Sequence, residues 1–135
     1  MRRETYSRTV KLLGDESRDA LEEATNYAAI LLTFGRFEEA KSVLRKRIPV
    51  AQRLLGASDE FMFKMRGCYA DALYSDPDAT LSELRDAVTR FEDLARDARR
   101  VLGSAHPFVA GAIGKSLRAA QEALRARETP SGDAV

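Results

Sequence analysis

Arg53-Leu54-Leu55-Gly56 is the stretch that decides the fold, because its pattern of two aliphatic residues before a glycine occurs twice more in the chain. The other copies are Leu12-Leu13-Gly14 and Val101-Leu102-Gly103. Gly14 and Gly56 are 42 positions apart, and Gly56 and Gly103 are 47 apart. Recurrence of one motif at such a spacing is typical of arrays of helical repeats.

Positions between these glycines align as well. At an offset of 42 residues the aligned pairs are Asn26 with Cys68, Tyr27 with Tyr69, Ala28 with Ala70 and Leu31 with Leu73. Counted back from Gly56 and Gly103, the aligned pairs are Ala40 with Ala87, Leu44 with Phe91 and Ala51 with Ala98. We therefore place the five extra residues of the second unit in its middle, around positions 75–79.

Each unit is predicted to contain two helices joined by a turn. In the first unit, apolar residues keep the spacing of one helical face at Leu21, Ala24, Ala28, Leu31 and Leu32. Gly35 suits the left-handed end of that helix, and a second helix is expected over residues 37–55. Pro49 lies inside it, so we expect a bend there or a helix that ends and restarts.

The second unit carries its own start signal. Thr80-Leu81-Ser82-Glu83 has the T-x-x-E pattern of a capping box, which predicts that a helix begins there. No stretch alternates polar and apolar residues with a period of two, so we expect no strands. The predicted fold class is all-α, with about six helices.

The predicted organisation has five parts. Residues 1–14 form the last helix of a partial repeat, 15–56 a first repeat, and 57–103 a second repeat with the insertion. Residues 104–128 form a helix of a third repeat or a cap, and 129–135 a disordered tail. Because a repeat buries its apolar face only against its neighbours, the chain is expected to be either a fragment of a longer array or a capped minimal stack.

Composition narrows the function classes. The 135 residues carry 22 basic and 21 acidic side chains, mixed along the sequence, for a net charge of +1. A nucleic-acid binder usually shows a basic excess, so we expect no nucleic-acid partner. The longest apolar stretch, 27–32, is six residues, far short of a membrane span. With no signal-peptide pattern and the single Cys68, a cytoplasmic location is expected.

The candidates for chemistry are few. The single histidine, His106, and Cys68 are 38 positions apart and do not supply a metal-ligand set or a nucleophile with its base. Gly114-Lys115-Ser116 resembles the end of a phosphate-binding loop, but Val109 occupies the position of its other glycine and no strand precedes it. We expect no enzymatic activity, no metal and no cofactor.

Two motifs carry a family resemblance. Gly35-Arg36-Phe37-Glu38-Glu39-Ala40 resembles the G-R-[FY]-E-E-A centre of tetratricopeptide repeats. Leu102-Gly103-Ser104-Ala105-His106-Pro107 resembles the L-G-x-x-H-P junction of the 42-residue, kinesin-light-chain-like subclass, and residues 53–59 are a weaker copy. The resemblance implies antiparallel helix pairs stacked as a right-handed α-solenoid, with inner helices lining a concave groove.

The resemblance also implies which residues face that groove. In the first unit these are Glu22, Thr25, Asn26, Ala29 and Thr33; in the second, Lys64, Gly67, Cys68, Asp71 and Tyr74; in the third, Gly111, Lys115, Arg118 and Gln121. In the family an asparagine at the position of Asn26 binds the backbone of a bound peptide. Lys64, Lys115 and Arg118 favour an acidic ligand, with ordinary surface charge as the alternative.

The expected function is therefore that of a protein-interaction module or scaffold that binds a peptide or partner protein in this groove. One alternative is a structural segment that self-associates through its terminal helices, for which an apolar stripe at Leu117, Ala120 and Leu124 should be exposed. Another is a regulatory part of a longer protein. Because repeat folds host unrelated partners, the fold alone does not name the ligand.

Overall fold

The computed structural model describes residues 17–128, and all its regular structure within that range is helical. The helices are α2 (Arg18–Thr33), α3 (Phe37–Leu55), α4 (Glu60–Ser75), α5 (Leu81–Leu102), the π-helical segment η1 (Phe108–Ile113) and α6 (Gly114–Glu128). The prediction of an all-α fold is thus confirmed for this part of the chain. Instead of about six helices, the described residues form five α-helices and η1; residues 1–14 and 129–135 lie outside them.

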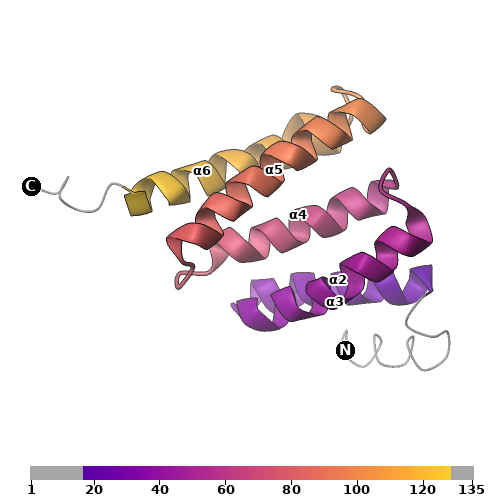
Figure 1. Cartoon of the computed structure of the whole chain (residues 1–135), viewed down its shortest axis with the longest axis horizontal. Helices are drawn as coiled ribbons and strands as arrows, with labels where there is room; N and C mark the ends of the chain where they lie inside the picture. The colour runs from indigo at the N-terminus through magenta and orange to yellow at the C-terminus, as the bar shows by residue number, and fades with distance from the viewer. Residues whose placement is uncertain (1–16, 129–135) are drawn as a thin grey trace, which may run out of the picture.

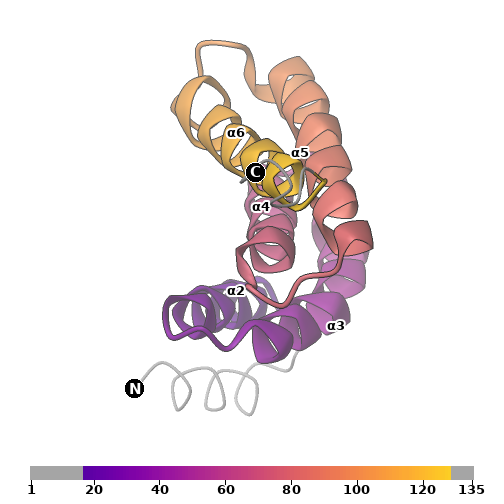
Figure 2. The ribbon, with the colours of Figure 1, turned by 90° about the vertical axis from the view of Figure 1, so that its left-hand side faces the viewer.

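The helices form two layers (Figures 1 and 2). Figure 2 shows α2, α4 and α6 on one side and α3 and α5 on the other. Each helix packs against the next one in the chain, and α4 also contacts both α2 and α6. We call the first set the α2–α4–α6 layer. Helix α4 is therefore the centre of the fold, with neighbours from α2, α3, α5 and α6.

Local sequence signals explain where the helices begin. The Ser17 hydroxyl accepts a hydrogen bond from the amide of Ala20, and the Asp59 carboxylate accepts one from the amide of Phe61. At α5 both halves of the predicted capping box are present, at 3.0 Å from the Glu83 amide to Thr80 Oγ1 and at 2.9 Å from the Thr80 amide to Glu83 Oε1. These bonds satisfy amides that the first helical turn leaves unpaired.

Glycines mark two of the helix ends as predicted. Gly56 follows α3 with φ of 86°, and Gly103 follows α5 with φ of 91°. This left-handed region is open to glycine at little cost. Pro49 does not end α3, which runs unbroken through it to Leu55. The alternative of a helix that ends and restarts is therefore wrong.

The insertion in the second unit is divided between two places. The turn after α4 spans residues 76–80, against 34–36 after α2, so it accounts for two of the five extra residues. The other three lengthen the following helix, since α5 has 22 residues and α3 has 19. Placing all five extra residues around 75–79 was thus only partly right.

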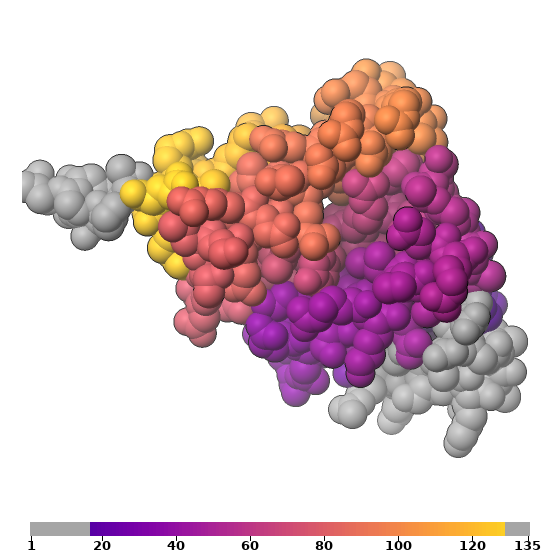
Figure 3. Space-filling model, viewed as in Figure 1, coloured from indigo at the N-terminus to yellow at the C-terminus, as the bar shows by residue number. Residues whose placement is uncertain are grey.

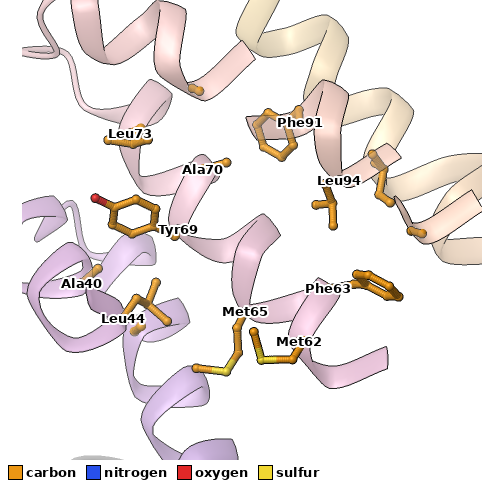
Figure 4. Packing of buried hydrophobic residues seen from close by; sticks show 14 of the residues in the cluster. Ala40, Leu44, Met62, Phe63, Met65, Tyr69, Ala70, Leu73, Phe91 and Leu94 are labelled. Carbon is orange, nitrogen blue, oxygen red and sulfur yellow. The ribbon is translucent and has the colours of Figure 1, made fainter. Parts of the chain in front are cut away.

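The core lies on both sides of α4. Figure 4 shows Met65 and Tyr69 of α4 pointing toward Ala40 and Leu44 of α3. Leu94 and Phe91 of α5 lie on its opposite side, and both are about as buried as the α3 side chains. The buried residues are Leu21, Ala24, Ala28, Leu31, Ala40, Leu44, Ala51, Phe63, Met65, Ala70, Leu73, Ala87, Phe91, Leu94 and Ala98, among others. The helical periodicity of the sequence therefore identified the core positions of α2 and those aligned between the units, but not Phe63, Met65 or Leu94.

Ion pairs about one repeat apart join successive helix pairs. Arg18 of α2 contacts Asp59, the residue before α4, at 3.2 Å. Arg85 of α5 contacts Glu128 of α6 at 3.3 Å. Lys41 of α3 contacts Glu83 of α5 at 3.1 Å and Glu38 of its own helix at 2.7 Å.

Lys41 differs from the other two cations because only 2% of it is exposed. Burial by itself would lower the pKa of its ammonium group, but the hydrogen bonds to Glu38 and Glu83 outweigh burial and raise the pKa. The hydrogen bond from the Thr80 amide, followed by the one from Lys41, lowers the pKa of Glu83. Lys41 is thus a buried charge with its compensating charges in place.

Candidate functional site

A cavity of about 160 Å³ lies where α4, α5, η1 and α6 meet. It is lined by Lys64, Gly67, Cys68, Asp71, Phe91, Leu94, Phe108, Ala112, Ile113 and Ser116. We call it the α4–α6 cavity. Most of its wall is apolar, and its polar side chains come from α4 and α6.

Asp71 is the acidic group of this cavity. Its side chain is half-buried, and burial raises the pKa of its carboxyl group to about 6, although the hydrogen bond from Ser116 of α6 works in the opposite direction. Among residues 17–128 no lysine or arginine forms an ion pair with it. The carboxylate is therefore only partly compensated.

Cys68 and Tyr74 flank Asp71 on α4. Burial and the nearby Asp71 charge raise the pKa of the Cys68 thiol to about 12, so the thiol is neutral and a poor nucleophile near neutral pH. Burial and Asp71 also raise the pKa of Tyr74, whose ring meets Phe91 edge to face at 5.9 Å. Both neighbours of Asp71 are thus uncharged groups.

The π-helical segment η1 forms one wall of the cavity. The His106 imidazole before it accepts a hydrogen bond from the Phe108 amide at Nδ1, while Nε2 lies 3.5 Å from Glu60. These contacts join the start of η1 to the start of α4. A π-helical turn is wider than an α-helical turn, and such turns are frequent at functional sites.

The predicted groove residues of α4 are brought together here. Lys64, Gly67, Cys68 and Asp71 all line the cavity, and Tyr74 continues their face of α4 by one turn. Gly67 is not a point of close helix contact, because a Cβ there would be 3.5 Å from Leu94 Cδ2, an ordinary van der Waals distance. Side chains of α5 and η1 complete the wall.

The predicted residues of α2 lie apart from the cavity. Asn26, Ala29 and Thr33 are exposed, and Glu22 is half-buried with an ion pair to Arg18 at 3.1 Å. The prediction that Thr25 faces the groove is wrong. Its side chain is buried, with 9% exposed, and its hydroxyl donates a hydrogen bond to the Leu21 carbonyl at 2.9 Å. A threonine that satisfies its hydroxyl on the preceding turn can be buried in a helix packing face.

The predicted basic residues of α6 lie on a separate shallow hollow. Lys115 and Arg118 are exposed and line it with Ala119, Gln121, Glu122 and Arg125. Gly111, in η1, is exposed, and a Cβ there would meet nothing within 4 Å. Close packing therefore does not explain this glycine.

The opposite face has a hollow of its own, visible between α3 and α5 in Figure 3. Its volume is about 360 Å³, and its lining includes Met62 and Arg66 of α4. Arg66 contacts Asp97 at 3.1 Å, so the charges in this hollow are paired. Asp71 on the other side of α4 has no such partner among the described residues.

The sequence analysis did not identify two of the residues that matter here. Ser116 appears there only in the comparison with a phosphate-binding loop, but in the structure it lines the same cavity as Cys68 and Asp71. Lys41 was not singled out at all, yet Lys41 and Glu83 are separated by the repeat period of 42 residues. Opposite charges at one repeat spacing on equivalent helices could have identified that contact.

The described residues contain neither a metal-binding cluster nor a membrane-spanning helix. Among the described residues no three histidine, cysteine, aspartate or glutamate side chains lie close enough together to hold a metal ion. None of the helices within residues 17–128 combines the length and hydrophobicity needed to cross a bilayer.

Comparisons with models of protein families, with curated proteins and with solved structures find no match to this chain. The tetratricopeptide resemblance therefore depends on the sequence motifs quoted above.

Proposed function

We propose that this chain is a protein-interaction module whose helix pairs stack as a right-handed tetratricopeptide-type superhelix. The partner is a peptide or protein segment that lies along the α2–α4–α6 layer, and the module itself carries out no chemistry. The observation that carries the proposal is the succession of contacts from α2 to α4 to α6, with exposed polar residues on each helix. A row of equivalent helices is the surface that such arrays use for partners.

Charge supports an acidic partner for this layer. Lys64 of α4 and Lys115 and Arg118 of α6 are exposed. Complementary charge speeds association and selects partners more than it adds affinity. Binding should therefore weaken as salt is raised, since exposed charges are screened over about 8 Å at physiological ionic strength.

The self-association alternative is less well supported. Of the three residues whose exposure it requires on the last helix, Ala120 is buried and Leu117 and Leu124 are only half-buried. The large apolar residues that are exposed among residues 17–128 are Phe34, Leu54 and Val101, which lie at helix ends and do not form a stripe on α6.

The test is a selection of binding peptides from a displayed random library, followed by affinity measurement with purified chain. A variant carrying Asn26→Ala, Lys64→Glu and Lys115→Glu should lose roughly tenfold in affinity or more, which is about 1.4 kcal/mol. The matched control carries Lys46→Glu and Arg99→Glu, which reverse exposed charges on α3 and α5. Equal loss in both variants, or no loss in either, would place binding outside the α2–α4–α6 layer and contradict the proposal.

A further inference from the structure

The α4–α6 cavity is the part of the layer with the most defined chemistry. It combines an apolar wall from α5 and η1 with one carboxylate, Asp71, one exposed lysine, Lys64, and the uncharged Ser116. At about 160 Å³ the cavity is smaller than the pockets of roughly 300–1,000 Å³ that hold drug-sized ligands, so its size suits one side chain. The occupant is therefore a single side chain that is apolar along its length and polar at its end.

The charge of that polar end follows from the groups around Asp71. On α4 its neighbours Cys68 and Tyr74 carry raised pKa values and are neutral at physiological pH. Helix α6 contributes the uncharged Ser116, while α5 and η1 contribute Phe91, Leu94, Phe108 and Ile113. A half-buried carboxylate in such surroundings gains most from a cation, because a charge-assisted hydrogen bond is about twice as strong as a neutral one.

The cation is not supplied from within the described part of the chain. Lys64, the basic residue in the lining, lies two helical turns before Asp71, about 10 Å along α4, and its side chain is exposed. No ion pair joins it to Asp71. Lys64 instead lies at the far end of the cavity lining and Lys115 in the separate hollow of α6, where their exposed ammonium groups suit acidic residues on either side of an inserted basic one.

We propose that the α4–α6 cavity binds one arginine side chain of the partner segment, with its methylene stem against Phe91, Leu94 and Phe108 and its guanidinium on Asp71. A guanidinium presents a planar fork of donors that matches a carboxylate, and its stem is apolar, so both parts of the cavity are used. The partner segment then has an arginine flanked by acidic residues. This inference rests on the proposed function, because it names the anchor of the same partner.

The test uses Nα-acetyl-arginine amide as the probe and the uncharged citrulline equivalent as its matched control, titrated into the labelled full chain by NMR. The arginine probe should shift the amides of Gly67, Ile113 and Ser116 with a dissociation constant on the order of 1–10 mM, as expected for so small a ligand. The citrulline probe should bind at least tenfold more weakly, on the order of the loss from one charge-assisted bond.

Two variants complete the test. Asp71→Asn keeps the size of the side chain and should weaken arginine binding roughly tenfold or more, whereas Glu92→Gln removes an exposed carboxylate of α5 and should leave it unchanged. Equal binding of arginine and citrulline, shifts confined to other regions, or no shifts at about 20 mM probe would each overturn the inference.

The two proposals can fail separately. Library peptides that bind the α2–α4–α6 layer but keep their affinity for Asp71→Asn would overturn the arginine anchor and leave the interaction module standing. An arginine probe that occupies the cavity in a chain that selects no peptide would support the anchor site and overturn the proposed function.

Discussion

Two charged side chains withdrawn from solvent, Lys41 of α3 and Asp71 of α4, differ in how their charge is compensated. Lys41, at the junction of α3 and α5, is almost fully buried and contacts two carboxylates. Asp71, on the side of α4 that faces α6, is half-buried and has no ion pair with a lysine or arginine among residues 17–128. A compensated charge fixes the packing of two helices, whereas an uncompensated one leaves room for an external cation. Removing the charge of Lys41 or of Asp71 should therefore change the free energy of unfolding in opposite directions.

The largest expected effect is at Lys41. Lys41→Glu places a third carboxylate beside Glu38 and Glu83 and should lower the free energy of unfolding by about 3–5 kcal/mol, measured by urea denaturation. Lys41→Met keeps the stem and should stay within about 1 kcal/mol of the unchanged chain. Lys46→Glu, at an exposed position of the same helix, is the control and should change it by at most about 0.5 kcal/mol. A well-tolerated Lys41→Glu would show that the pair does not hold α3 to α5.

Asp71→Asn should raise the free energy of unfolding, the opposite of the effect of Lys41→Glu. Because the pKa of Asp71 is raised from 3.8 to about 6 in the folded chain, ionisation costs folding free energy, and stability from this group is present at low pH and lost as pH rises through 6. A shift of this size corresponds to about 3 kcal/mol at most, and partial exposure reduces it. We expect Asp71→Asn to be roughly 1–3 kcal/mol more stable than the unchanged chain at about pH 7.5.

The pH profile gives the control for this prediction. The difference in unfolding free energy between the two chains should shrink between about pH 7.5 and pH 5, because every other titratable group is common to both chains. Glu92→Gln should show no such dependence. A constant difference across this range would mean that Asp71 is not destabilised by its surroundings.

A third, smaller effect tests whether the Lys41 contact is part of a network. Thr80→Ala removes one half of the α5 capping box and should cost about 1 kcal/mol, measured by thermal and urea unfolding. Glu83 accepts hydrogen bonds from both the Thr80 amide and Lys41. The loss of unfolding free energy caused by Thr80→Ala should therefore differ by about 0.5 kcal/mol or more when Lys41→Met is also present. Additive losses would indicate two independent contacts.

The smallest effect is expected at Gly67, beside Asp71. Gly67→Ala adds a Cβ at 3.5 Å from Leu94 Cδ2 and should stabilise the chain by about 0.5–1 kcal/mol, because alanine favours a helix more than glycine does. The added methyl group should also narrow the α4–α6 cavity and weaken the binding of the arginine probe. Gly103→Ala is the contrasting control: with φ of 91° it should cost about 1 kcal/mol. A destabilised Gly67→Ala would show that the glycine is needed for packing.

Much of the fold could be predicted because its signals are local. The helical spacing from Leu21 to Leu31, the capping box at Thr80 and the glycines at 56 and 103 each act within a few residues. The burial of Thr25 could not be read in this way. Its hydroxyl is satisfied by its own helix, so a polar side chain could pack in a contact face that the sequence does not identify.

The candidate site was predicted only in part for the same reason. The resemblance implied its α4 side, where Lys64, Cys68 and Asp71 share one helical face. The other walls come from Phe91 of α5 and from η1 and Ser116, which approach α4 only after the helices pack. No spacing along the chain records that approach, and a π-helical turn has no distinctive residue pattern here.

By itself the sequence determined the helical class and most helix ends, because periodicity, caps and glycine conformation are short-range properties of the chain. Only the tertiary structure decided which charges are compensated. Lys41 meets Glu83 across 42 residues, whereas Asp71 shares a cavity with Ser116 and has no ion pair among residues 17–128, and both outcomes depend on where whole helices lie. Desolvation and charge pairing act through space, so the same residue types became a structural contact at one junction and a candidate binding site at the other.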